Sequence, residues 1–155
     1  SPRMRRTDLH LRAEDMTGEA RRLDDLHAVA GVFVAHAMFG EPLWQPGDQV
    51  RTGMAQCLSE GVATFGLLLT ILIGVRHRPQ AIPALVAAYI FAAYWFTAST
   101  SFANPAVTLA RAFTQTFAGI RFADVGGFVV AQAAGASIAW GVAKRLLPSE
   151  ASGSA

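Results

Sequence analysis

The polar residues that suggest chemistry in this 155-residue sequence lie inside an uncharged region, in the stretch 99–111. Asn104 is a favourable N-cap, and Pro105 suits a first helical position because its missing N–H would be unpaired there. Residues 106–113 are compatible with helix, so a helix is predicted to start at membrane depth. Backbone that is not helical at that depth is tolerated only where it is buried in protein or lines a water-filled cavity. The stretch therefore indicates a pore. The alternative is that Asn104 serves only as a helix cap.

Glu60 is the single charged residue in a second apolar run, residues 54–75. An acid inside a membrane is costly, which makes Glu60 a candidate functional residue. The alternative is an end-of-helix residue that reaches water, because Glu60 falls within the first two turns of the run. His36 lies in a shorter apolar run, and no partner ligand follows it at helical spacing. It is expected to be packed or interfacial.

Composition places the chain among membrane proteins, since 52% of the residues are apolar and 15% are charged. Six of the thirteen basic residues and six of the eleven acidic residues fall in the first 26 positions. The remaining arginines are scattered, so no nucleic-acid partner is expected. The single cysteine, Cys57, supports neither a disulfide framework nor a metal cluster and is expected to be a small buried hydrophobe. No cofactor is expected.

The charged head, residues 1–26, is expected to be solvated or partly disordered, with a short surface helix near residues 18–26 as one option. Residues 27–39 form an apolar run of about 13 residues, roughly 20 Å as helix, which is too short for a membrane core of about 30 Å. This run is interpreted as the outer part of a span. Residues 40–53 are rich in turn-forming residues and indicate an aqueous loop.

Three full spans are predicted, at residues 54–75, at 81–100 and from 125 to about 147, before a polar tail at residues 148–155. Small residues around Ala131 and Gly135 give the last span faces for close helix packing. Basic residues follow the first of these spans, at positions 76–78, and end the last one, at positions 144–145. By the positive-inside rule these ends and the C-terminus are cytoplasmic, so the re-entrant stretch faces outward.

The sequence Asn-Pro-Ala followed by Val-Thr-Leu-Ala, in this setting, resembles the re-entrant loop of the aquaporin (major intrinsic protein) family. The family pore consists of two inverted repeats, each with two spans, a half-helix and a third span. A cytoplasmic turn between the first two spans belongs to the second repeat. The resemblance therefore implies an all-α membrane fold in which residues 27–147 form an aquaporin-like C-terminal half. This half would contain a truncated span, two full transmembrane helices, the re-entrant half-helix and a last transmembrane helix.

The resemblance also implies roles for individual residues. Asn104, Pro105 and Ala106 would form the pore motif, and Glu60 would accept hydrogen bonds from the re-entrant loop. By register from Asn104, the outer selectivity constriction corresponds to Ala92, Ser101 and Val107.

Water-selective members of the family carry histidine and arginine where this sequence has Ala92 and Val107. The constriction is therefore expected to be wider and less polar, with ordinary small-residue packing as the alternative for Ala92 and Ser101. Arg111 lies one turn beyond Val107 on the same helix face and is a candidate vestibule cation. Snorkelling to the interface or pairing with a neighbour is the favoured alternative for Arg111.

The function that the resemblance implies is an aquaporin-like channel subunit or half-channel for water or small neutral solutes, of the glycerol or metalloid type. The expected location is a bacterial-type plasma membrane. The expected partners are the lipid bilayer, the solute and a complementary first-half chain or oligomer. The main alternative is a truncated, non-conducting fragment that only packs with another membrane protein. An enzyme is disfavoured, because the spans hold Glu60 and His36 but no nucleophile, base and orienter at suitable spacing.

Overall fold

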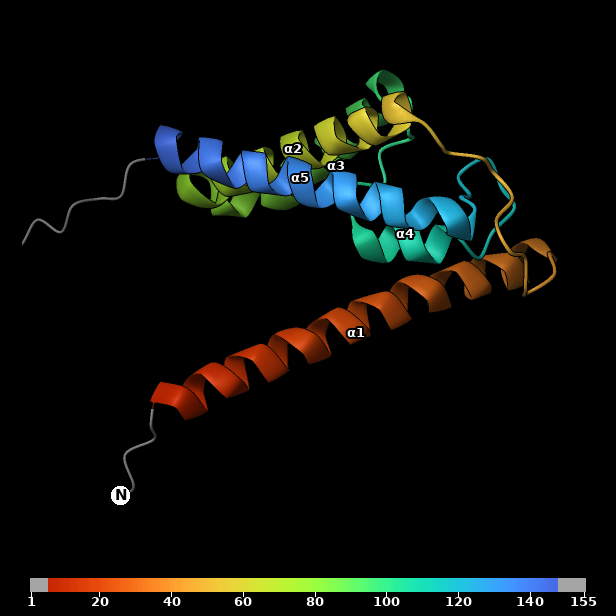
Figure 1. Cartoon of the computed structure of the whole chain (residues 1–155), viewed down its shortest axis with the longest axis horizontal. Helices are drawn as coiled ribbons and strands as arrows, with labels where there is room; N and C mark the ends of the chain where they lie inside the picture. The colour runs from red at the N-terminus through yellow and green to blue at the C-terminus, as the bar shows by residue number, and fades with distance from the viewer. Residues whose placement is uncertain (1–5, 148–155) are drawn as a thin grey trace, which may run out of the picture.

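The computed structural model describes residues 6–147, with side chains of the first helix described at Glu19 and from Arg22 onward. The elements in chain order are α1 (Arg6–Phe39), α2 (Met54–His77), η1 (Pro79–Ala81), α3 (Ile82–Phe96), α4 (Pro105–Arg111) and α5 (Phe122–Leu146). Within these residues the fold is all-helical (Figure 1). Three segments are long and apolar enough to cross a membrane, namely Met54–His77, Pro79–Phe96 and Phe122–Leu146. The predicted all-α membrane fold with three full spans is confirmed.

The helices α2 and α5 make the most extensive contact between elements. A Cβ atom built on Gly135 would lie 2.2 Å from the carbonyl oxygen of Gly61. The two helices therefore approach backbone to backbone at this crossing, where no side chain fits between them. The predicted close packing through the small residues of the last span is present.

Helix ends differ from the predicted positions at three places. α3 ends at Phe96 rather than at residue 100, because the backbone of Thr97 is extended, with φ −105° and ψ 135°, which a continuing right-handed helix cannot contain. α4 ends at Arg111, two residues short of the expected end. α5 begins at Phe122, three residues before the expected start, with Arg121 as its extended N-cap. Hydropathy marks apolar runs and does not resolve these backbone changes.

The charged head is helical from Arg6 onward, so this part is not disordered as one alternative had it, and its solvated state stays a prediction. α1 runs without interruption from Arg6 to Phe39, across the boundary expected near residue 26. The segment has no proline and is rich in alanine, arginine and leucine, which favour helix regardless of the change in polarity. Figure 1 shows α1 inclined away from α2, α3 and α5, and α4 is the element that it contacts. The division of the chain into a head and an aquaporin-like half stays a prediction, and the tail lies outside the described residues.

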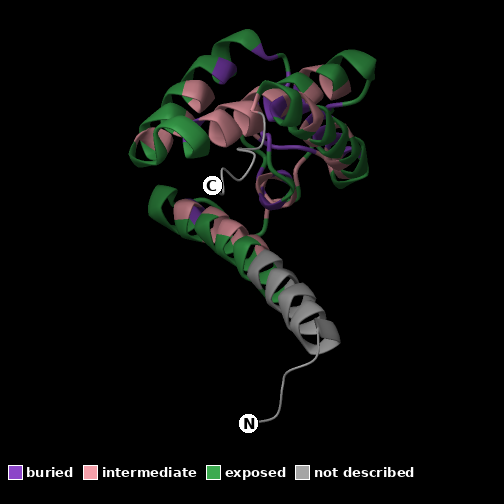
Figure 2. Ribbon diagram, turned by 90° about the vertical axis from the view of Figure 1, so that its left-hand side faces the viewer, coloured by how far each residue is buried: buried purple, intermediate pink, exposed green. Residues whose placement is uncertain are grey.

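The best-buried part of the protein is the region around α4 (Figure 2). Its apolar cluster consists of Phe102, Ala112, Ile120 and Phe128. Phe102 comes from the loop before α4 and meets Phe128 of α5 edge to face, with ring centroids 5.3 Å apart. The re-entrant loop is thus part of the core, and its position is fixed by packing.

Candidate functional site

Asn104 begins the half-helix α4 and keeps an amide group exposed. Its Oδ1 accepts a hydrogen bond from the Ala106 N–H over 2.8 Å, and its carbonyl accepts one from the Thr108 N–H over 2.9 Å. The side chain is exposed, and its Nδ2 group donates to no other residue among those described. Asn104 is therefore a cap, as the local sequence predicts, and it also presents free donors beside the start of the helix.

Glu60 lies beneath the re-entrant loop and is 0% exposed. Its Oε2 accepts a hydrogen bond from the Phe102 N–H over 3.3 Å, and its Oε1 accepts one from the Ala103 N–H. The alternative, an end-of-helix residue that reaches water, is therefore wrong for Glu60. A buried carboxylate that accepts backbone N–H groups satisfies donors that the loop would otherwise leave unpaired.

Gln132 of α5 connects Glu60 to the half-helix, and the sequence analysis did not anticipate it. Its Nε2 donates to Glu60 Oε1 over 3.1 Å and to Thr108 Oγ1 over 2.8 Å. The Thr108 hydroxyl in turn donates to the Asn104 carbonyl over 2.9 Å. The available signal was an amide inside an apolar span, which is costly unless it is paired.

The loop before α4 holds three non-glycine residues in the left-handed region. The φ values are 62° at Thr100, 49° at Ser101 and 50° at Ala103. Such conformations cost about 1–3 kcal/mol each and persist only where surrounding contacts impose them. Glu60 supplies two of these contacts, and Ser59 Oγ accepts the Ser99 N–H over 3.3 Å.

Arg51 fixes the other side of this loop, although the sequence placed it in an aqueous loop. Its guanidinium is buried and donates to the carbonyls of Ser99, Phe117 and Gly119 over 3.0, 2.8 and 2.7 Å. Burial lowers the pKa of Arg51 from its ordinary value, and the nearby Arg111 charge lowers it further. The group still stays protonated at any physiological pH.

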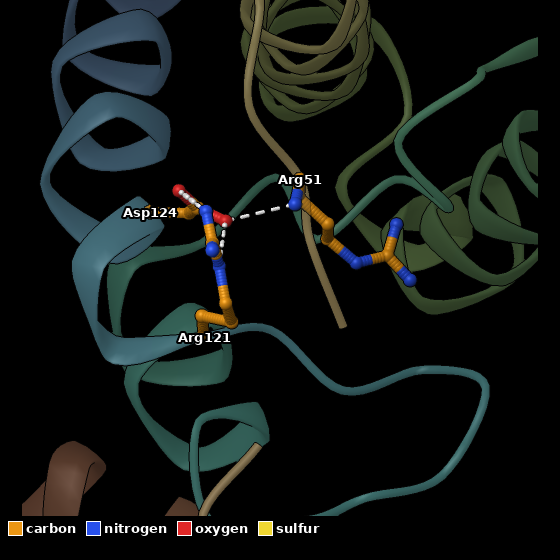
Figure 3. Close-up of polar contacts among 3 residues, drawn as sticks. All are labelled: Arg51, Arg121 and Asp124. Carbon is orange, nitrogen blue, oxygen red and sulfur yellow. Dashed lines mark hydrogen bonds and ion pairs between the residues drawn. The ribbon is translucent and has the colours of Figure 1, made fainter. Parts of the chain in front are cut away.

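Asp124, in the first turn of α5, holds the backbone of Arg51. Its Oδ2 accepts the Arg51 N–H over 2.8 Å, and the Arg121 guanidinium pairs with both carboxylate oxygens at 3.1 Å. Figure 3 shows the Arg51 guanidinium pointing away from Asp124, so the backbone N–H and the side chain of Arg51 make separate contacts. The helix dipole favours an acid in the first turn of a helix. This position of Asp124 is the sequence signal for such an anchor.

The three predicted constriction residues lie in different environments. Ala92 is exposed on α3, and Val107 is partly buried against the apolar cluster that contains Phe102. Ser101 is buried, and its Oγ has no hydrogen-bond partner among the described residues. That these three side chains border one pathway stays a prediction.

Arg111 pairs with neighbouring side chains. Its Nη2 donates to Tyr94 Oη over 2.5 Å, its Nη1 donates to Thr100 Oγ1 over 3.5 Å, and its Cζ lies 4.3 Å from the centroid of the Phe102 ring. The side chain also lines a cavity of about 730 Å³ beside α1.

His36 closes the contact between α1 and the segment that follows α4. It is buried, with Nδ1 3.1 Å from the Leu43 carbonyl oxygen and Nε2 3.0 Å from Thr114 Oγ1. The residue is packed, which is one of the two predicted positions, and it is also hydrogen-bonded. Its two ring nitrogens are thus both engaged by protein groups.

Comparisons with known proteins identify one informative relative. The chain is 58% identical over 120 residues to aquaglyceroporin AqpS of Rhizobium meliloti (strain 1021). The match covers 77% of this chain and 52% of the relative, so the chain spans about half the length of the curated relative that it matches. No family model and no solved structure matches the chain.

Proposed function

Because the chain belongs to the aquaporin (major intrinsic protein) family, we propose that this integral membrane protein forms one half of a channel for small uncharged solutes. The observation that carries the proposal is the exposed amide of Asn104 at the start of a half-helix whose loop is held by buried Glu60. An amide and free N–H groups at a helix start stabilise acceptor oxygens and oppose cations. The protein supplies a path and no chemical step.

The proposed solute is larger than water, of the neutral polyol or undissociated metalloid-acid type. Val107 is apolar and packs beside Phe102, and Ala92 carries only a methyl group, so neither adds a large polar side chain. The relative is called an aquaglyceroporin, which agrees with this class of solute.

A complementary first-half chain is proposed as the partner. Among the described residues only one half-helix is present, and Asn104 and Pro105 at its start are exposed. In lipid an open start of this kind would leave polar backbone groups unpaired. The basic residues at positions 76–78 and 144–145 favour a cytoplasmic location for the C-terminal end of α5 by the positive-inside rule, and a bacterial inner membrane is the proposed location.

The proposal is tested by stopped-flow swelling of membrane vesicles from cells in which the chain occurs naturally, compared with vesicles from the same cells with its gene deleted, so that a first-half chain is present in both. Glycerol entry should depend on the chain and should fall strongly in Asn104→Leu, which removes the exposed amide. Gln80→Leu is the matched control, since Gln80 is an exposed amide in the short helix η1 between α2 and α3. Equal swelling with and without the chain would instead support the non-conducting fragment.

A further inference from the structure

Arg111 joins α4 to α3 beside the predicted constriction position Val107. It lies one helical turn after Val107, and its partner Tyr94 lies two residues after Ala92 on α3. Three contacts fix the guanidinium, because it also reaches Thr100 Oγ1 and covers the Phe102 ring. A side chain held from three directions keeps its charge in one place.

The two guanidiniums near Phe102 form no ion pair, although the Glu60 carboxylate accepts the Phe102 N–H and its charge acts on Arg51. The Cζ atoms of Arg51 and Arg111 lie 5.1 and 4.3 Å from the same ring centroid. Among the side chains that the structure describes, neither guanidinium forms an ion pair with a carboxylate. Glu41 lines the same cavity as Arg111, but its carboxylate accepts a hydrogen bond from Gln45 Nε2 over 3.3 Å instead.

The two guanidiniums differ in what they can offer to a solute. Arg51 uses Nε, Nη1 and Nη2 on three backbone carbonyls. Arg111 uses one hydrogen bond each from Nη1 and Nη2 among the described residues, so three of its five N–H donors stay available. Arg111 also borders open space, since it lines the cavity of about 730 Å³.

We propose that Arg111 forms a second barrier to cations in the pathway, one helical turn beyond Val107 and in addition to the start of α4, and that Tyr94 positions it. This inference rests on the proposed channel function. A fixed guanidinium at the entrance raises the energy of any positive ion, while its N–H groups donate hydrogen bonds to the hydroxyl oxygens of a neutral solute. The apolar constriction at Val107 can then be wide without admitting cations.

The test compares two permeabilities in vesicles from cells that produce the full chain. Glycerol is the neutral probe, and tetramethylammonium is the cationic probe because it has no uncharged form. Arg111→Gln should raise the ratio of tetramethylammonium to glycerol permeability by about tenfold or more, as expected for loss of one unscreened charge. Arg111→Lys should restore most of the exclusion, and Tyr94→Phe should give an intermediate ratio. Arg121→Gln is the control, since its charge is already paired with Asp124.

Each result separates the two proposals. An unchanged ratio in Arg111→Gln, with glycerol entry present, overturns the inference about Arg111 and leaves the channel function standing. Absence of chain-dependent glycerol entry in the wild type removes the channel function and this inference together. Loss of both permeabilities in Arg111→Gln and Arg111→Lys, at normal amounts of chain in the membrane, would show a purely structural role and would also overturn it.

Discussion

Gln132 of α5 donates a hydrogen bond to the carboxylate of Glu60 of α2 over 3.1 Å, and both side chains are buried. The same amide nitrogen reaches Thr108 of α4 over 2.8 Å. Two spanning helices and the half-helix are therefore connected through one buried polar group. Buried polar networks of this kind are sensitive to the loss of any member, because the remaining groups cannot form replacement hydrogen bonds with water.

Glu60→Gln is expected to destabilise the loop before α4. The substitution places an amide NH₂ where a carboxylate oxygen accepts a backbone N–H, so a buried donor is left unpaired. The loss should be about 1.5–3 kcal/mol for each charged hydrogen bond removed. Thermal unfolding of the detergent-solubilised chain would measure it, with the exposed Glu41→Gln as the control. An unfolding midpoint equal to that of the wild type would contradict the role assigned to Glu60.

Gly135→Ala is expected to separate α2 from α5, because the added Cβ would lie 2.2 Å from the Gly61 carbonyl oxygen. Overpacking of a tight contact costs about 1–3 kcal/mol. Gly141→Ala is the matched control on the same helix, since no atom lies within 4 Å of its added Cβ. Replacing glycine by alanine there should be neutral or stabilising. Similar unfolding midpoints for both variants would show that the crossing tolerates a methyl group.

Asp124→Asn is expected to loosen the loop of residues 40–53. The substitution removes the charge that pairs with Arg121 and weakens the acceptor for the Arg51 N–H. Arg51 should then become accessible, and limited trypsin digestion should cut after it faster than in the wild type. Asp48→Asn, a change of an exposed acid in the same loop, is the control. Unchanged cleavage after Arg51 would mean that its guanidinium contacts suffice to hold the loop.

Val107→Arg is expected to alter selectivity in vesicles that contain the assembled channel. The guanidinium would narrow the proposed constriction and place five donors in the path. Entry of glycerol should fall far more than entry of water. Val50→Arg, the same change at an exposed loop position, should leave the ratio of the two unchanged. Equal loss of both solutes, or loss of neither, would show that Val107 does not face the pathway.

The purified chain alone is expected not to conduct. The described residues supply one half-helix, and its exposed start would meet lipid unless another chain covers it. Unpaired backbone groups in that setting cost several kcal/mol each. Swelling of vesicles reconstituted with the purified chain should match that of empty vesicles. Robust glycerol entry under these conditions would mean that the chain completes a pore without a first-half partner.

The spans and the half-helix were predictable because they depend on local properties. Run length and charge locate α2, α3 and α5, and the Asn104-Pro105 pair gives the start of α4 to the residue. Glu60 was predictable because an acid in an apolar run needs a partner. The burial of Arg51 was not predictable, since its carbonyl partners Ser99, Phe117 and Gly119 lie 48 to 68 positions away in sequence. A turn-rich segment gives no sign of such partners.

The length of α1 was missed for a related reason. Hydropathy changes near residue 26, whereas helix formation depends on backbone propensity, which does not change there. The early end of α3 was missed because Thr97 to Ser101 are small and uncharged, and nothing in their polarity distinguishes a span from a turn with positive φ angles. These are backbone properties that a hydrophobicity pattern does not report.

The contact between Gly61 and Gly135 also determines a distance elsewhere. Gly61 follows Glu60 directly, and Gly135 lies three residues after Gln132, so the crossing of the helices and the Glu60–Gln132 hydrogen bond belong to the same turns of α2 and α5. A hydrogen bond of this kind tolerates only a few tenths of an ångström of stretching. Because Gly61 and Gly135 have no side chains, α2 and α5 come close enough for the Glu60 carboxylate, the Gln132 amide and the loop before α4 to meet. A change in the distance between α2 and α5 would therefore also move the loop before α4.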